Sequence, residues 1–135
     1  MSSFAIFDTS ILIDRLRYGR HVERMHGLGM LVRPCAVVIA ELMRGVQDKE
    51  EWKFLEILTN SPFIVTPTTS IWLESGEILA QIRAEHGFEP KKLRELHFDV
   101  LIALTARAHG ALLVTSNGVD FELIREYRDF PLEVW

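Results

Sequence analysis

Four carboxylates stand where an apolar run of the sequence ends or is interrupted: Asp8, Glu41, Asp99 and Asp120. Asp8 directly follows the apolar run 4–7, and Glu41 interrupts an apolar segment with helical spacing. Carboxylates that lie close together repel and raise each other's pKa, and a divalent cation removes that penalty. Magnesium and manganese prefer such oxygen ligands. If the fold brings the acids together, they predict a Mg²⁺ or Mn²⁺ site, which can activate water and stabilise a leaving oxygen.

Hydroxyl and amide side chains accompany these acids: Thr9, Ser10, Thr115 and Asn117. Two of them come directly after Asp8, and the other two follow the apolar run 111–114. In open α/β sheets, ligands bind beyond the carboxyl ends of the strands, where the strand order switches. We therefore expect these groups to be accessory polar residues of the same site.

Each residue also has a purely structural explanation when it is taken singly. Asp8 is suited to a helix N-cap, and Asp99 to an acid in a first helical turn. Asn117 and Asp120 are suited to a turn and a cap. Glu41 is harder to explain in this way, because a buried Glu is rare unless it is paired.

The elements that must position these residues alternate along the chain. Apolar runs predict strands at 4–7, 31–32, 62–65, 111–114 and 132–134. Helical spacing predicts helices over 11–16, 37–43, 50–58, 71–86, 91–96, 99–109 and 121–127. This alternation predicts an α/β fold with a mostly parallel sheet of about five strands and helices on both faces. No linker divides the chain, so we expect one domain over residues 1–135.

Composition excludes several other classes of protein. The chain has 135 residues, 48% of them hydrophobic, which argues against intrinsic disorder. It has no apolar run long enough to span a membrane. The single cysteine excludes an intrachain disulfide and a Cys-rich zinc site. With no basic segment at the N-terminus, a secretory signal is not expected, and we predict a cytoplasmic protein.

The ordered set of motifs resembles that of a PIN-domain nuclease, and its size and order resemble the VapC-like toxins of VapBC toxin–antitoxin modules. The matching segments are Asp8-Thr9-Ser10-Ile11-Leu12-Ile13-Asp14, Glu41-Leu42, the run from Phe98 to Ala106, Thr115-Ser116-Asn117 and Asp120-Phe121. Each piece alone is weak, whereas the ordered set at these spacings is fairly specific and covers essentially the whole chain.

The resemblance implies metal-dependent hydrolysis of RNA phosphodiester bonds with Mg²⁺ or Mn²⁺. By position, Asp8, Glu41 and Asp99 match the three main acids of the family, and Asp120 matches the acid of its last motif. The resemblance also implies that the first and fourth strands are adjacent. The partners that it implies are an RNA substrate, a VapB-like antitoxin, DNA only through that antitoxin, and a second copy of the chain.

Basic residues leave a further question open. Arg15 and Arg17 follow Asp8 closely and are candidate RNA contacts, the alternative being a solvated charged surface. Lys91, Lys92 and Arg94 allow the same two explanations.

Two other functions compete with the nuclease. The first is a catalytically silent or permanently inhibited PIN-like subunit that assembles a DNA-binding regulatory complex with its antitoxin. The second is a phosphotransfer domain of the receiver type, which is disfavoured because no lysine follows the strand at 111–114.

Overall fold

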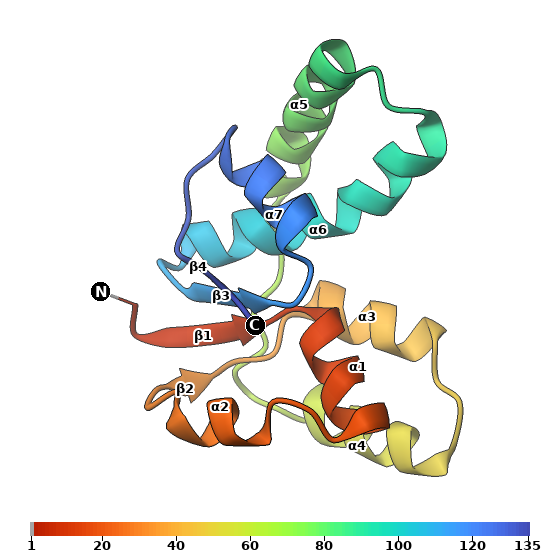
Figure 1. The fold of residues 1–135 in the computed structure, drawn as a ribbon, viewed down its shortest axis with the longest axis vertical. Coiled ribbons are helices and arrows are strands. Elements are labelled where there is room, and N and C mark those ends of the chain that lie inside the picture. The colour runs from red at the N-terminus through yellow and green to blue at the C-terminus, as the bar shows by residue number, and fades with distance from the viewer. Residues whose placement is uncertain (1) are drawn as a thin grey trace.

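The computed structural model describes residues 2–135. The strands are β1 (Phe4–Phe7), β2 (Leu31–Val32), β3 (Leu112–Thr115) and β4 (Leu132–Val134). The helices are α1 (Thr9–Tyr18), α2 (Val22–Gly27), α3 (Ala36–Arg44), α4 (Lys49–Thr59), α5 (Thr69–His86), α6 (Pro90–Ala108) and α7 (Gly118–Arg125). Figure 1 shows α1 to α4 on one side of the two central strands and α5 to α7 on the other.

The sheet has the order β2-β1-β3-β4, and each neighbouring pair is parallel. The chain leaves β1 for β2 on one side and later returns to β3 on the other. The strand order therefore switches between β1 and β3, and the carboxyl ends of these two strands are where a ligand site is expected. The first strand and the fourth predicted strand (111–114, observed as β3) are adjacent, in agreement with the fold that the resemblance implies.

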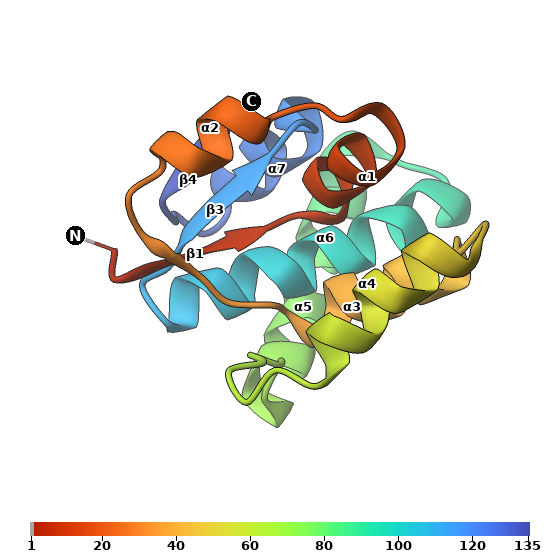
Figure 2. The ribbon, with the colours of Figure 1, turned by 90° about the horizontal axis from the view of Figure 1, so that it is seen from below.

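Both faces of the sheet are covered, because all four residues of β1 are buried and alternate between two apolar layers. Phe4 and Ile6 join the larger core, which includes much of α3 and α6. Ala5 and Phe7 join a smaller cluster with Ile11 of α1 and neighbours from α2. Figure 2 shows α2 and α6 on opposite sides of the strands. The prediction of helices on both faces is confirmed.

The strand predicted at 62–65 does not form. Only Val65 pairs, through a single parallel bridge to Cys35. Its N–H donates to the carbonyl of Pro34 at 2.9 Å, and its own carbonyl accepts from Ala36 N–H at 2.9 Å. Phe63 is 60% exposed, so the apolar run does not enter the core as a strand. The sheet has four strands rather than about five.

Two helices predicted at 91–96 and 99–109 are one helix, α6. No glycine or proline interrupts the sequence between them, so the backbone hydrogen bonds continue without a break. Asp99 consequently lies in the middle of a helix and not at its start, and the explanation of Asp99 as a first-turn acid is wrong. In residues 2–135, no helix is long and apolar enough to cross a membrane.

Candidate functional site

Asp8 lies at the end of β1 and is almost completely buried, with 3% of the residue exposed. The register pairs Phe7 with Val114, so the following residues of the two strands are neighbours. The hydroxyls of Thr115 and Ser10 each donate to Asp8 Oδ2 at 2.8 Å. Burial raises the pKa of Asp8, and these two hydrogen bonds oppose the rise. Although Asp8 stands at the N-cap of α1, its side chain makes no cap hydrogen bond.

Glu41 approaches the same place from α3. The Thr9 hydroxyl, at the start of α1, donates to Glu41 Oε1 at 2.9 Å. Burial raises the pKa of Glu41, while the Thr9 hydrogen bond lowers it and the charge of Asp8 raises it again. The half-buried glutamate therefore accepts from a hydroxyl and faces the charge of a second acid, while the charge of Arg44 lowers its pKa.

Asp99 connects the four acids electrostatically. Its pKa is raised to about 8, first by burial and then by the charges of Asp8, Glu41 and Asp120. Lys92 is the charged neighbour that lowers this pKa. Because Asp99 responds to all three other carboxylates, α6 places it among them, and the four predicted acids lie in one region of the molecule.

Asp120 has a different environment. It stands in the first turn of α7, and the Lys92 ammonium group donates to its Oδ1 at 2.9 Å. The Asn117 amide donates to its Oδ2 at 3.0 Å. Asn117 occupies the N-cap position of α7 but makes no side-chain cap hydrogen bond. Each oxygen of Asp120 therefore accepts a hydrogen bond. Within residues 2–135, Asp120 is also the one acid of the four that forms an ion pair with a lysine or arginine.

The chemistry of this donor set fits a hard divalent cation. Carboxylate and hydroxyl oxygens predominate, and burial together with the charges of the other three acids raises the pKa of Asp99. Within residues 2–135, however, no three Asp, Glu, His or Cys side chains form a ready-made metal site.

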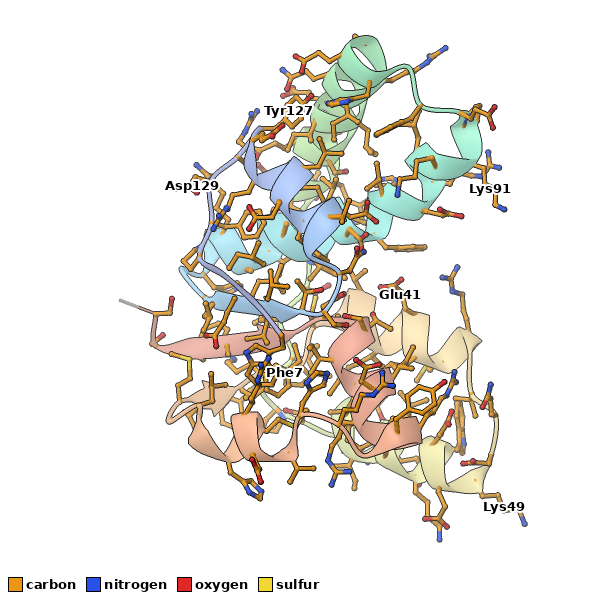
Figure 3. All side chains as sticks on the ribbon, in the orientation of Figure 1. Phe7, Glu41, Lys49, Lys91, Tyr127 and Asp129 are labelled. Atoms are coloured by element: carbon orange, nitrogen blue, oxygen red, sulfur yellow. The ribbon has the colours of Figure 1, made fainter. Side chains whose placement is uncertain are left out.

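An open cleft of about 500 Å³ lies beside the acids, between α3 and the first half of α6. It is lined by Glu41, Arg44, Lys91, Arg94, Glu95, His97 and Phe98. Figure 3 labels Glu41 and Lys91 on the two facing elements. Of the four acids only Glu41 lines this cleft, so the cleft leads away from the acidic site along a surface with three cationic side chains.

The two arginines singled out in the sequence have different environments. Arg17 Nε binds Glu51 Oε2 at 3.1 Å, and Arg17 Nη2 donates to the carbonyl of Gly45 at 2.7 Å. These contacts connect α1 to the start of α4. Arg15, in the same last turn of α1, is exposed and makes no ion pair within residues 2–135.

Two side chains near the site have contacts that the sequence did not predict. The first is Lys92, which donates to Asp120. Lys92 precedes Asp99 by seven residues, which is two turns of one helix, and this spacing could have indicated that both residues lie on the side of the acidic site. The second is His97, whose Nε2 lies 3.1 Å from the Ser75 hydroxyl on α5. Burial lowers the pKa of His97, which lies in the wall of the cleft.

Comparison with known proteins adds a family. The model of the PIN domain family matches residues 5–127 of the chain. No curated protein sequence matches it as a relative.

Several solved structures are similar over nearly the whole chain. A chain of VapBC2 from Rickettsia felis, bound to a DNA fragment from its promoter, gives a TM-score of 0.74 at 22% identity, with 98% of each chain covered. A chain of DNA-bound VapBC from Salmonella typhimurium gives 0.67 at 21% identity, covering 100% of this chain and 99% of that one. A toxin–antitoxin complex from Klebsiella pneumoniae gives 0.58 at 24% identity, covering 87% and 89%. These likenesses show the fold.

Proposed function

The chain belongs to the PIN domain family, and on that premise we propose that it is an endoribonuclease that depends on Mg²⁺ or Mn²⁺ and hydrolyses RNA phosphodiester bonds. The observation that carries this proposal is the charge cluster around Asp99, whose pKa of about 8 reflects burial and three neighbouring acids. A group of buried carboxylates is unfavourable for folding and is typical of a site that binds a cation.

Asp8, Glu41 and Asp99 are the proposed metal ligands, and Asp120 is a fourth acid of the site. When bound, the cation activates water and stabilises negative charge on the phosphate. Thr115 and Ser10 hold the carboxylate of Asp8 in place by donating to one oxygen, which leaves the other oxygen without a side-chain donor. Thr9 fixes Glu41 in the same way. Asn117 orients Asp120 through its amide.

The cleft supplies a path for the RNA backbone. Arg44, Lys91 and Arg94 line it next to Glu41, and cationic side chains of this kind contact phosphates without reading the sequence. Arg15 is exposed and remains a proposed RNA contact. For Arg17 we propose the structural alternative, because Glu51 already binds its guanidinium group.

We further propose that the protein is the toxin of a type II toxin–antitoxin module in the cytoplasm. The similar chains come from VapBC complexes and another toxin–antitoxin complex, and the two VapBC complexes are bound to DNA. A VapB-like antitoxin is therefore the proposed partner, with DNA contacted only through it. A homodimer is proposed as well, and sedimentation of the free chain at twice the mass of 135 residues would support it.

The test is cleavage by the purified chain, free of any partner, incubated with total RNA and Mn²⁺ or Mg²⁺. We expect discrete cuts that disappear in EDTA and in Asp8→Asn. The exposed acid Asp129 provides a matched control, and Asp129→Asn should cut at the rate of the unchanged chain. Cleavage that persists in EDTA or in a folded Asp8→Asn variant would refute the assignment.

A second function has support in the same comparisons. Two of the similar structures are complexes on DNA, and they favour as the second candidate a subunit without activity in the cell that assembles a DNA-binding regulator with its antitoxin. The isolated chain separates the two functions. A folded chain that binds Mn²⁺ but cuts no RNA of any class would favour the regulatory subunit.

A further inference from the structure

Lys92 lies within the acidic site and not on its rim. Its ammonium group is 2.9 Å from Asp120 Oδ1, and the side chains of this pair are 37% and 18% exposed. The neighbouring Lys91, in contrast, is an exposed residue of the cleft wall. One helix therefore presents two consecutive lysines, of which only the second is an ion-pair partner of an acid in the site.

The position of Lys92 follows from the continuity of α6. Seven residues separate it from Asp99, which is close to two helical turns, so both residues lie on one face of the helix. The helix thus brings an acid and a cation to the same region from a single rigid element. The positive charge of Lys92 also lowers the pKa of Asp99, so Lys92 acts electrostatically on Asp99 as well as on its ion-pair partner Asp120.

Asp120 has no oxygen left without a donor. Lys92 takes Oδ1, and the Asn117 amide takes Oδ2 at 3.0 Å. Each of these oxygens keeps a second lone pair, but the Lys92 ammonium group places a positive charge 2.9 Å from Asp120 Oδ1, and that charge repels a second cation at Asp120. Two metal ions about 3.5–4 Å apart need a shared set of ligands on both sides, and here one side is occupied by an ammonium group.

We propose that Lys92 takes the place of a second metal ion, so that the centre binds a single divalent cation through Asp8, Glu41 and Asp99. This inference rests on the metal site of the proposed function. In this arrangement Asp120 is the ion-pair partner of Lys92, and Lys92 is a positioning residue that holds Asp120 away from the metal.

The experiment is a titration of the purified full chain with Mn²⁺ alone, following free Mn²⁺ by electron paramagnetic resonance. We expect one Mn²⁺ per chain. Asp120→Asn should also bind one, with an affinity within about threefold of the unchanged chain. Lys92→Met frees Asp120 and should gain a second Mn²⁺. Lys92→Arg keeps the charge and should stay at one.

Lys91→Met is the matched control, since it removes the same charge one residue away and should leave the stoichiometry at one. Thermal unfolding of each variant verifies that it is folded before titration. Two Mn²⁺ ions on the unchanged chain, loss of tenfold or more in affinity in Asp120→Asn, or a single ion on folded Lys92→Met would each overturn the inference. No Mn²⁺ on the unchanged chain would instead refute the metal site itself, and this inference with it.

Discussion

Thr115 is the residue that fixes the most buried acid of the site. Its hydroxyl donates to Asp8 Oδ2 at 2.8 Å and accepts from the backbone N–H of Asn117 at 2.9 Å. One side chain thus joins the end of β3 to the end of β1 and to the N-cap of α7, the helix that carries the last acid. The hydrogen bond also opposes the rise in the pKa of Asp8 that burial causes.

Thr115→Val should therefore destabilise the protein and impair the site together. A buried carboxylate that loses a donor costs about 1.5–3 kcal/mol of unfolding free energy, and the pKa of Asp8 should rise further. We expect cleavage to fall at least tenfold, and urea unfolding measures the loss of stability. Thr115→Ser keeps the hydroxyl and is the control. If valine and serine behave alike in both assays, the hydrogen bond has no such role.

The pKa of Asp99 predicts a dependence of stability on pH. Its ordinary value of 3.8 is raised to about 8 in the folded protein. Between these two values the folded state keeps a proton that the unfolded state has released, so stability falls as pH rises. In EDTA, Asp99→Asn should remove part of this fall and melt a few degrees higher than the unchanged chain at pH 8.5.

The difference should shrink toward pH 5, where Asp99 is protonated in the folded state of the unchanged chain. Melting curves at pH 5, 7 and 8.5 measure it, and Asp129→Asn serves as the control for loss of an exposed acid. Parallel curves for the unchanged chain and Asp99→Asn over this range would contradict the raised pKa.

At the scale of elements, the last turn of α1 carries two arginines with different roles: Arg17 contacts neighbouring elements, and Arg15 is exposed to solvent. Arg17 connects α1 to α4 through Glu51 and to the α3–α4 loop through Gly45, whereas Arg15 is exposed. Arg17→Ala should lower the melting temperature with little effect on RNA affinity. Arg15→Ala should leave the melting temperature unchanged and weaken RNA binding, with a smaller dependence of affinity on salt.

Fluorescence anisotropy with a short labelled RNA, in EDTA and at several salt concentrations, separates the two arginines. Equal losses of RNA affinity in both variants, with unchanged melting temperatures, would show that Arg17 contacts RNA despite its partner.

The sequence predicted the elements that have strong local signals. β1 and β4 match their predicted ranges. The helix α5 ends before Gly87 as expected but begins two residues before its predicted range, with Thr68 as its N-cap. An apolar run of four residues bounded by a polar residue, or a long helical pattern bounded by a cap and a glycine, is sufficient for such elements.

The errors arise where partners distant in sequence decide the structure. The run ending at Val65 has a strand composition, but within residues 2–135 its bridge is to the short segment around Cys35, and pairing stops after this one bridge. The break predicted before Asp99 does not exist, because no residue between 96 and 99 interrupts the helical hydrogen bonds. The helix α2 was not predicted, and none of its residues is buried.

The same distinction applies to the site. Residue type and order predicted the four acids, and the register of β1 with β3 places the first beside Thr115. Their role as metal ligands stays a prediction. Two ion pairs could not be predicted from the sequence: Lys92 with Asp120 and Arg17 with Glu51. The partner of a charged side chain depends on how the helices pack against one another.

At the scale of the whole molecule, the acids come from different elements, and a cation between them should act as a cross-link. Mn²⁺ at 100 times its dissociation constant should stabilise the fold by about 2.7 kcal/mol. Thermal unfolding with Mn²⁺ and with EDTA measures this gain. Asp99→Asn should lose most of it and Asp129→Asn should keep it. An equal gain in both variants would place the bound Mn²⁺ elsewhere.

The pairing of Asp8 with Thr115 also has a consequence for biosynthesis. These residues are 107 positions apart, so the first acid is translated long before the hydroxyl that holds it. At about 5–20 residues per second, that interval lasts roughly 5–20 s. A growing or truncated chain that lacks β3 has no hydroxyl of Thr115 to hold Asp8, so its acidic site is not assembled. A nascent toxin of this fold would therefore be inactive toward RNA until most of the chain has been synthesised.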